Sequence, residues 1–318
     1  MRAITVQDRT ASLQNIPDPA PPAGEVLIRV RMAGICSTDL EIIRGYAGFQ
    51  GVIGHEFVGT VAEGPNTLKG KRVVGEINCV CGRCDMCQSG LSTHCRRRTV
   101  LGIQDRSGCF ADYITLPEKN CLVVPNTVTD EEAVFTEPLA AAFQVLRQAK
   151  IEKRSNVAVI GTGRLGILVA QVLATTGCKL TAIGRNPKTL GLLDRAGIRA
   201  TTLEDFPQKN DIDVAVDCTG NPEGLGVALS LVRPRGTIVV KTTCKADHGI
   251  DLTPLVVNEI TLLGSRCGPF GDALNALHRK QFDLTGMITR TMSLDDGLQA
   301  IKLASEPDQI KVLLKISS

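Results

Sequence analysis

The sequence predicts a mixed α/β protein with two domains, one built on a doubly wound parallel sheet and the other rich in β-strands. Its 318 residues suffice for two domains that each bury a core. Residues 150–264 alternate short apolar runs with helical stretches, which is the pattern of a parallel sheet covered by helices. The preceding part of the chain contains an alternating strand and two groups of potential metal ligands. Together these observations predict the fold class.

The composition is that of an ordinary globular protein, with 43% hydrophobic and 22% charged residues. A net charge of +3 is too small to favour nucleic acid or a membrane as a partner, so we expect neither. The first eight residues lack the apolar run of a signal peptide, and no apolar stretch is long enough to predict a membrane span. Twelve Cys without an export signal indicate a reducing, cytoplasmic compartment, where clustered Cys bind metal more often than they form disulfides.

The first strong strand signal covers residues 25–32. Apolar Val26 and Ile28 alternate with Arg29 and Arg31. This two-residue period predicts a half-buried strand of an antiparallel sheet. The N-terminal part of the chain is therefore expected to be β-rich.

Three side chains of the types that bind Zn²⁺ follow this strand. They are Cys36, His55 and Glu56, and Glu137 offers a fourth partner far downstream. Their separation in the sequence means that a site would have to form on converging loops. The plain alternative is that Cys36 is a small core residue and that His55 and Glu56 form a polar turn.

A second cluster reads C-x2-C-x2-C-x7-C, a spacing that suits a closed, tetrahedral structural zinc site. Its thiols are those of Cys81, Cys84, Cys87 and Cys95. Three alternatives remain at this point: a disulfide pair, an iron–sulfur cluster, or a nucleic-acid-binding zinc ribbon that uses Arg83 and the arginines at 96–98.

A dinucleotide fingerprint opens the second half of the chain. The apolar run at 156–160 predicts a strand buried on both faces, and residues 167–174 predict a helix. A G-x-G-x-x-G loop in this context lets the backbone approach a pyrophosphate at the N-terminus of the helix. The loop consists of Gly161, Thr162, Gly163, Arg164, Leu165 and Gly166.

Further strand and helix signals continue the same alternation and predict a doubly wound parallel sheet. The strands are expected at 180–183, 213–217, 237–240 and 260–263, and helices at 188–196 and 222–232.

The end of the second strand of this sheet bears on the choice of cofactor. An acid usually stands there in NAD-binding proteins and holds the adenosine ribose. Here Gly184 takes the place and Arg185 follows. Without the acid a 2′-phosphate is not repelled, and Arg185 can bind it, so the sequence favours NADP over NAD. We expect Gly184→Asp to reverse this preference. The alternative is that Arg185 stacks on adenine, which suits either cofactor.

The order of these motifs resembles that of the zinc-dependent medium-chain alcohol dehydrogenases, in the sorbitol and threonine dehydrogenase-like branch. The likeness extends over nearly the whole chain. It rests on Gly-Ile-Cys-x-Thr-Asp at 34–39, Gly-His-Glu at 54–56, the four Cys at 81–95, Glu-Pro-Leu-Ala at 137–140 and the Gly-rich loop at 161–166. The implied fold is a Rossmann-type doubly wound sheet plus a β-rich GroES-like catalytic domain with a structural-zinc lobe. The implied boundaries are 1–139 with 265–318 for the catalytic domain and 140–264 for the cofactor domain.

The resemblance also implies roles for individual residues. Cys36, His55 and Glu137 would surround a catalytic zinc, with Glu56 either a further ligand or a contact of the ligands. Asp39 would orient the zinc-bound His, and Thr38 would pass the substrate proton. The relay His of some family members is replaced here by Glu41, so the resemblance supplies no proton exit path.

The implied activity is transfer of a hydride between NAD(P) and a small secondary alcohol or polyol, yielding a ketone or aldehyde. Two zinc ions per chain, a preference for NADP(H) and a homodimer or homotetramer are expected. A non-catalytic nucleotide-binding redox sensor on the same fold is the alternative. An intact ligand set argues against a sensor, because a binding module need not keep an open zinc site.

Overall fold

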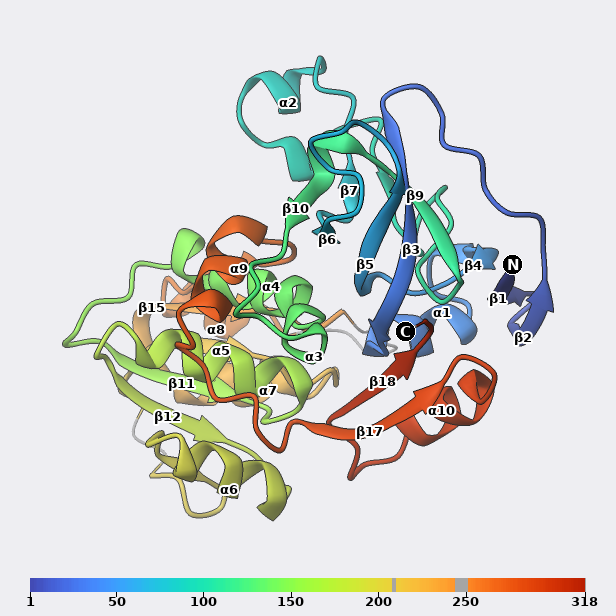
Figure 1. Cartoon of the computed structure of the whole chain (residues 1–318). Helices are drawn as coiled ribbons and strands as arrows, with labels where there is room; N and C mark the ends of the chain where they lie inside the picture. Colours follow the sequence, from blue (N-terminus) through green and yellow to red (C-terminus); the bar gives the residue numbers. More distant parts are fainter. Residues whose placement is uncertain (208–209, 244–250, 318) are drawn as a thin grey trace. The chain divides into compact units, whose positions relative to one another are not determined.

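The computed structural model describes residues 1–207, 210–243 and 251–317, and the chain divides into two compact units (Figure 1). Unit 1 comprises Met1–Glu137 and Phe270–Ser318, and unit 2 comprises Pro138–Pro269. The boundaries expected from the sequence, 139/140 and 264/265, lie a few residues from these. One unit is β-rich and the other contains a parallel sheet, so the expected fold class is confirmed.

Unit 1 is organised around a seven-stranded sheet in the order β10-β6-β5-β3-β18-β17, with β9 paired to β3. A three-stranded sheet, β2-β1-β4, and a two-stranded sheet, β7-β8, complete its strands. Their bounds are β1 Arg2–Gln7, β2 Thr10–Asn15, β3 Glu25–Gly34, β4 Gly51–Val52, β5 Glu56–Glu63, β6 Arg72–Gly75, β7 Asn78–Cys79, β8 Thr99–Val100, β9 Tyr113–Pro117, β10 Cys121–Val123, β17 Ile288–Ser293 and β18 Lys311–Lys315.

Short helices connect these strands. They are α1 Ser37–Ile43, α2 Asp85–Gln88, α3 Asp130–Ala133, α9 Phe270–His278 and α10 Gly297–Ala304, with 3₁₀ turns η1 Tyr46–Gly48, η2 Ser92–His94 and η3 Glu118–Asn120. A longer helix, α4 Thr136–Gln148, begins at the end of the first segment of unit 1.

The strand predicted at 25–32 is β3, the central strand of the large sheet. Arg29 points to solvent as expected, but Leu27 is buried as well as Val26 and Ile28. β3 pairs with β5, β9 and β18 at different points along its length, so it lies inside the sheet. The burial of Leu27 beside Val26 and Ile28 shows that both faces of β3 are covered there, which the two-residue alternation did not indicate.

Unit 2 contains a six-stranded, all-parallel sheet in the order β13-β12-β11-β14-β15-β16. In chain order this is 3-2-1-4-5-6, the doubly wound arrangement in which ligands bind at the carboxyl ends of the strands. The strands are β11 Asn156–Ile160, β12 Lys179–Ile183, β13 Ala200–Thr201, β14 Ile212–Asp217, β15 Val232–Val240 and β16 Thr261–Gly264. The helices are α5 Arg164–Ala174, α6 Pro187–Arg195, α7 Gly224–Leu231 and α8 Thr253–Val257.

Two elements of this sheet depart from the sequence-based expectation. Strand β13 was not predicted, because Ala200–Thr201 has no apolar run and forms a strand only by pairing with the end of β12. Strand β15 begins at Val232, inside the segment predicted as the end of a helix. The register between β14 and β15 shifts near Ile212, so the extra residues lie in an irregular part of the ladder.

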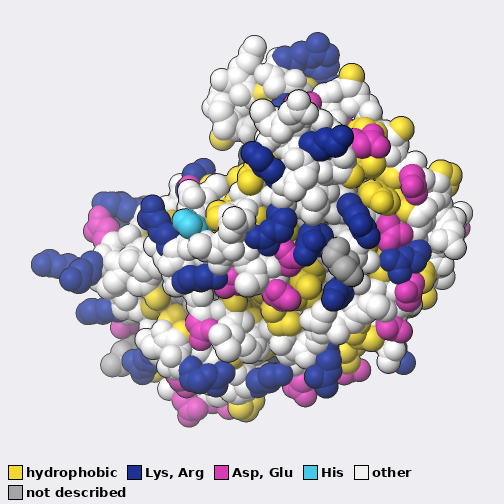
Figure 2. Space-filling model, in the orientation of Figure 1, with side chains coloured by type: hydrophobic (Ala, Val, Ile, Leu, Met, Phe, Trp, Pro, Cys, Tyr) yellow, Lys and Arg dark blue, Asp and Glu magenta, His cyan; other side chains and the backbone are white. Residues whose placement is uncertain are grey.

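No helix in the described part of the chain has the length and apolar character needed to cross a membrane. Basic and acidic side chains are interspersed on the face of the molecule shown in Figure 2.

Candidate metal centres and cofactor site

A single carboxylate organises the first predicted metal site. Asp39 is fully buried in the first turn of α1. Its Oδ2 accepts a hydrogen bond from the backbone N–H of Cys36 at 2.8 Å, and its Oδ1 lies 3.1 Å from Nδ1 of His55. Asp39 therefore fixes the cysteine that caps the helix and the orientation of the imidazole at the same time.

The structure brings Cys36, His55 and Glu56 together. One potential ligand atom from each of the three lies within 4.8 Å of the others. His55 is buried; burial opposes its charged form, but the Asp39 carboxylate and the Cys36 sulfur raise the pKa of the imidazole well above its usual value. The Thr38 hydroxyl lies 3.8 Å from the Cys36 sulfur, on the same turn of α1. Thiolate, imidazole and carboxylate form a donor set that suits Zn²⁺.

Glu56 has one oxygen that is bound and one that is not. Its Oε2 accepts a hydrogen bond from Nζ of Lys311 at 2.5 Å, and both side chains are buried. Its Oε1 is also buried and has no hydrogen-bond partner among the described residues. An unpartnered buried carboxylate oxygen is costly in an apolar interior. A cation held with Cys36 and His55 would satisfy it, so the residues present fit a zinc ion.

Glu137, the fourth expected ligand, does not join this cluster in the structure. It is half-buried at the start of α4. Burial raises the pKa of its carboxyl group to about 7, with His55 acting in the opposite direction and Glu56 adding to the increase. Glu137 is therefore close enough to influence, and be influenced by, the charges of the cluster. Glu41, which takes the place of a relay His, is bound to Arg44 at 2.6 Å.

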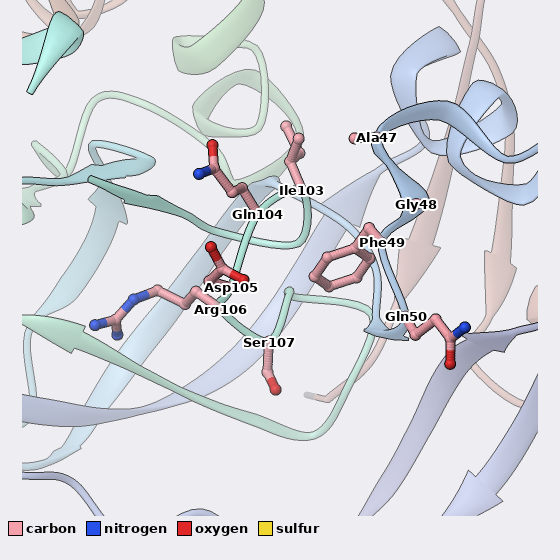
Figure 3. Close-up of a pocket in the computed structure, with 9 residues that line it drawn as sticks. All are labelled: Ala47, Gly48, Phe49, Gln50, Ile103, Gln104, Asp105, Arg106 and Ser107. Atoms are coloured by element: carbon pink, nitrogen blue, oxygen red, sulfur yellow. The ribbon is translucent and has the colours of Figure 1, made fainter. Parts of the chain in front are cut away.

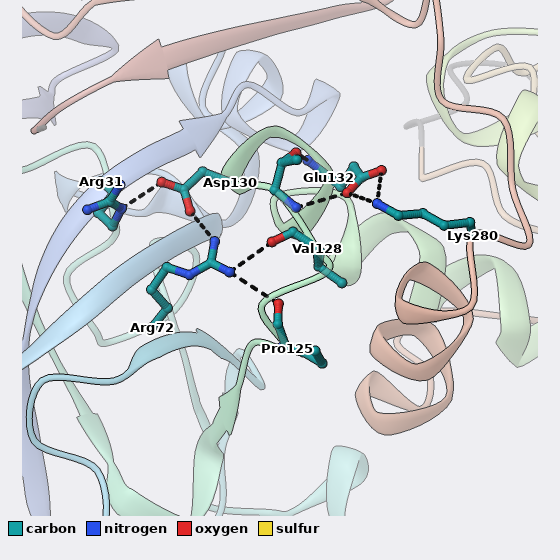
Figure 4. A network of polar contacts seen from close by, with 8 residues as sticks. Arg31, Arg72, Pro125, Val128, Asp130, Glu132 and Lys280 are labelled. Carbon is teal, nitrogen blue, oxygen red and sulfur yellow. Dashed lines mark hydrogen bonds and ion pairs between the residues drawn. The ribbon is translucent and has the colours of Figure 1, made fainter.

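The segment that leads to Glu137 is anchored to the large sheet (Figure 4). Asp130, in the first turn of α3, binds Arg31 of β3 and Arg72 of β6, each at 2.6 Å. Two residues on, Glu132 completes a capping box with Thr129 and also binds a lysine of the C-terminal segment. These contacts hold α3, and with it the approach of the chain to Glu137, at a defined place on unit 1.

The second cysteine cluster is assembled as the spacing predicted. Its four sulfurs lie within 4.8 Å of one another, and three pairs are separated by 3.5, 3.8 and 3.5 Å. A disulfide would require about 2.05 Å. Four sulfurs each about 2.3 Å from a central zinc would be about 3.8 Å apart, so the cluster fits a tetrahedral ion.

Local backbone hydrogen bonds favour the thiolate form of two of these cysteines, whereas burial raises the pKa of Cys87 to about 11. Backbone N–H groups near Arg83 lower the pKa of Cys81 to about 6, and those near Arg96 lower the pKa of Cys84. The guanidinium of Arg96 binds Asp85 through two hydrogen bonds of 2.8 and 2.7 Å. Arg96 is thus engaged within the lobe, which counts against its use as a phosphate contact in a zinc ribbon.

The predicted dinucleotide loop connects β11 to α5. Gly161 has φ of +93°, and a side chain at Gly166 would meet the carbonyl of Gly161, so glycine is required at both places. A Cβ at Gly163, the cap of α5, would meet nothing within 4 Å. This open cradle before the N-terminus of an 11-residue helix suits the pyrophosphate of a dinucleotide.

The end of β12 leaves little space beside Gly184. Gly184 is buried, whereas Arg185 is exposed on the turn that follows. A Cβ at Gly184 would collide with the side chain of Thr162, the second residue of the Gly-rich loop. The space that an Asp side chain at position 184 needs is filled by Thr162, so the structure gives no support to the expectation that Gly184→Asp alone reverses the cofactor preference.

A polar cavity of about 320 Å³ lies in unit 1 between residues 47–50 and residues 103–107 (Figure 3). The ring of Phe49 points from the first segment toward the second. The second segment continues into a stretch hydrogen-bonded to the chain before His55, through Gly108 N–H to Val52 O at 2.7 Å and Cys109 N–H to Gly54 O at 2.9 Å.

One residue of these sites, Lys311, was missed by sequence reasoning. It lies in the apolar run at 310–314, and a lysine inside such a run is a signal of a buried ion pair, although its partner could not be inferred. Thr162 is expected from the sequence as part of the dinucleotide-binding loop, but nothing in the sequence marks its packing against Gly184.

Comparisons with known protein families agree with this geometry. The alcohol dehydrogenase GroES-like domain family matches residues 22–126, and the zinc-binding dehydrogenase family matches residues 165–280. Among curated proteins, the chain is 29% identical to L-threonine 3-dehydrogenase of Chelativorans sp. (strain BNC1), over 95% of this chain and 94% of that protein. It is 27% identical to sorbitol dehydrogenase of Halalkalibacterium halodurans, over 95% of both chains.

Solved structures show the same architecture. A Sinorhizobium meliloti 1021 protein described as a zinc-binding dehydrogenase and bound to NADP matches with a TM-score of 0.89 and 26% identity, over 99% of this chain and 98% of that one. An alcohol dehydrogenase of Escherichia coli CFT073 in complex with NADH matches with a TM-score of 0.89 and 27% identity, over 99% of both chains. The chain therefore belongs to the zinc-dependent medium-chain alcohol dehydrogenase family, in the branch that includes the sorbitol and threonine dehydrogenases.

Proposed function

We propose that this protein is a zinc-dependent oxidoreductase that transfers a hydride between NAD(P) and a small secondary alcohol or polyol, forming the ketone or aldehyde. The observation that carries the proposal is the cluster of Cys36, His55 and Glu56, with a buried Glu56 oxygen that lacks a partner. The open cradle at Gly163 supports a dinucleotide as the hydride acceptor. The relatives that match most of this chain are named as dehydrogenases of threonine and sorbitol.

The residues of the cluster have separate tasks in this proposal. A zinc ion held there would supply a Lewis acid that makes a substrate hydroxyl more acidic, and the nicotinamide would supply the redox chemistry. Cys36, His55 and Glu56 would hold the ion, and Glu137 would approach it as a further ligand or a hydrogen-bond acceptor. Asp39 keeps the His55 ring in place. Thr38, partly exposed beside Cys36, would take up the proton of the substrate hydroxyl while releasing its own hydroxyl proton to water.

Cys81, Cys84, Cys87 and Cys95 would hold a second, structural zinc, giving two ions per chain. Support comes from sulfur spacings that match a tetrahedral site. In this arrangement unit 1 is the catalytic domain and unit 2 the dinucleotide-binding domain.

NADP(H) is the proposed cofactor in preference to NAD(H). No acid stands at the end of β12, and the exposed Arg185 makes no hydrogen bond or ion pair with any described residue. A charge-assisted contact with a 2′-phosphate contributes about 1.5–3 kcal/mol, or roughly tenfold to a hundredfold in affinity.

A homodimer, or a tetramer built from dimers, is the proposed assembly. β16 is an outer strand of the parallel sheet, so one of its backbone edges is left for pairing. Several of the large apolar side chains that are exposed in the described structure lie on or beside β16 and α8. They are Leu252, Val256, Val257 and Leu262. Two-fold pairing of β16 with the same strand of a second copy would cover both the edge and these side chains.

A non-catalytic nucleotide-binding redox sensor has no support among the named relatives.

The test is a screen of secondary alcohols and polyols with each cofactor, following the absorbance of the reduced nicotinamide. Cys36→Ser is the inactive control, and Cys178→Ser, distant in sequence from both clusters, is the matched control. Turnover of at least one alcohol, abolished by Cys36→Ser alone, is expected. If no alcohol is oxidised by zinc-loaded protein that binds a dinucleotide, the proposal fails.

A further inference from the structure

We propose that Thr162 is a specificity-determining residue of the dinucleotide site, because it bars an acidic side chain from position 184 and fixes the turn that carries Arg185. This inference rests on the proposed function, since it concerns how the same site distinguishes NADP from NAD. It assigns to the Gly-rich loop a part in reading the adenosine ribose in addition to its contact with the pyrophosphate.

The first part of the argument is volume. A Cβ built on Gly184 would collide with Oγ1 of Thr162 and would lie 2.8 Å from its Cγ2 and 2.9 Å from its Cβ. Carbon atoms pack at about 3.5–4.0 Å, so no side chain fits there without displacing Thr162. Thr162 cannot move outward easily, because it is 5% exposed and packed on the buried side of the loop. The structure thus excludes the carboxylate at 184 that would favour NAD.

The second part is a hydrogen-bond chain that begins at the same side chain. The Thr162 and Thr189 hydroxyls are 2.8 Å apart and buried, and the Thr189 hydroxyl donates to the carbonyl of Asn186 at 2.9 Å. A hydroxyl has one hydrogen, so Thr189 accepts from Thr162 while it donates to Asn186. The side chain of Asn186 in turn accepts from the N–H of Lys188 and caps α6.

This chain spans the turn that presents Arg185. Gly184 is in contact with Thr162 on one side of Arg185, and the Asn186 carbonyl is bound by Thr189 on the other. The backbone of Arg185 is therefore held at both neighbours while its side chain remains exposed. A fixed backbone lowers the entropy that is lost when the guanidinium orders around a 2′-phosphate.

Two consequences follow for substitutions. Gly184→Asp by itself should displace Thr162, break the hydroxyl chain and weaken both dinucleotides. Thr162→Ala combined with Gly184→Asp removes the colliding atoms except for the Cβ pair, which then needs a shift of about 0.6 Å to reach ordinary contact. The double variant should accept the carboxylate and bind NADH.

The experiment measures binding and not turnover. Calorimetric titration with NADPH and with NADH, together with the thermal midpoint, is carried out on the wild type, Gly184→Asp, Thr162→Ala, and the two double variants Thr162→Ala/Gly184→Asp and Thr162→Val/Gly184→Asp. Valine keeps the volume of threonine, so its double variant is the matched control for space. Thr162→Val and Thr162→Ser as single variants separate the hydroxyl from the volume.

We expect Gly184→Asp to lower the thermal midpoint and weaken NADPH and NADH alike, at least tenfold each. Thr162→Ala/Gly184→Asp should recover the midpoint and move the NADH-to-NADPH affinity ratio at least tenfold toward NADH, whereas Thr162→Val/Gly184→Asp should not. Thr162→Val alone should weaken the binding of NADPH severalfold with little effect on the binding of NADH. Thr162→Ser, which keeps the hydroxyl, should bind NADPH as tightly as the wild type does.

Results that contradict the role of Thr162 can be told apart from results that contradict the proposed function. A stable Gly184→Asp variant that switches to NADH would overturn the role of Thr162 and leave the proposed function intact. If Thr162→Ala/Gly184→Asp is no more stable than Gly184→Asp and binds NADH no more tightly, the role of Thr162 is also overturned and the proposed function is left intact. A wild type that binds neither dinucleotide would overturn the proposed function together with this inference.

Discussion

Nζ of Lys311 and Oε2 of Glu56 form an ion pair of 2.5 Å in which both side chains are almost fully buried, although the two residues are 255 positions apart in the chain. The pair joins β18 to the first residue of β5, next to His55. The Lys311 ammonium also lies 5.7 Å from the centre of the Phe135 ring. Lys311 thus compensates the charge at one oxygen of Glu56, and the other oxygen has no hydrogen-bond partner among the described residues.

Removal of Lys311 should therefore destabilise the protein. Lys311→Met leaves a buried carboxylate without its partner, and breaking a buried pair in this way costs about 3–5 kcal/mol. The free energy of unfolding from urea titration is the measurement. Lys315→Met, at the exposed end of the same strand, is the matched control and should change little. The double variant Glu56→Gln/Lys311→Met should be more stable than Lys311→Met alone; an equal or lower stability would contradict the pairing.

Two zinc ions per chain are expected, with different consequences when each is lost. Cys84→Ser should reduce the zinc content by one and lower the thermal midpoint by many degrees, because a structural zinc is coupled to folding. Cys36→Ser should also lose one zinc but should abolish turnover with the fold nearly intact. Metal analysis and circular dichroism of chelator-washed protein are the measurements. One or no zinc in the wild type, or unfolding of both variants, would contradict the division of roles.

The relative contributions of Glu56 and Glu137 to zinc binding can be compared directly by substitution. The sequence-based expectation placed Glu137 ahead of Glu56 as a ligand, whereas the structure places Glu56 in the cluster and Glu137 beside it. We now expect Glu56→Gln to lower zinc affinity more than Glu137→Gln, and both to lower kcat by at least tenfold. Competition with a chromogenic chelator measures the first quantity. A greater loss of zinc affinity in Glu137→Gln than in Glu56→Gln would instead make Glu137 the stronger ligand of the two.

Asp39 should control zinc affinity without binding the ion. It holds both the N–H of Cys36 and the ring of His55. Asp39→Asn presents an amide in which only one group can accept, so one of these contacts is lost. Losses of an orienting partner typically reduce metal affinity by about 10–100-fold. Chelator competition should show a loss of this size with an unchanged circular dichroism spectrum, and an unaffected affinity would contradict it.

A pH-dependent contribution to stability is expected from Glu25 and Arg106. Arg106 binds both oxygens of Glu25, at 2.9 and 2.7 Å, and both side chains are largely buried. The Arg106 hydrogen bonds lower the pKa of Glu25, against the opposing effect of burial. Because the folded pKa lies below the unfolded value of about 4.3, the stabilisation is present above that value and is lost as the pH falls through the folded one.

Glu25→Gln should therefore cost about 1–3 kcal/mol near pH 7, and the difference from wild type should shrink below about pH 4. Urea titrations at the two pH values are the measurement. Glu63→Gln, at the exposed end of β5, is the control and should lack this pattern. A gap that is constant or widens as the pH falls would contradict the assignment.

Features that are local in the sequence were predictable from it. β11 has the bounds expected from its apolar run, and the glycines of the loop that follows are required by the turn and by helix packing. The four cysteines of the structural cluster lie within one short segment, so their spacing alone indicated that they could meet. In each case the physical requirement is met within a few residues of the motif.

Features that depend on packing between distant segments were decided only by the tertiary structure. No pattern in the sequence pairs Lys311 with Glu56, because the partner of a buried charge is set by which strands become neighbours. The sequence likewise could not show that Glu56 joins Cys36 and His55, because that requires β5 and the start of α1 to be neighbours in the fold. The sequence shows that Gly184 stands where an acid is usual. Only the structure shows that Thr162 occupies the space that an acidic side chain at position 184 would need. The sequence determines which side chains are available, and the close-packed interior determines which of them share a site, because one volume can be occupied only once.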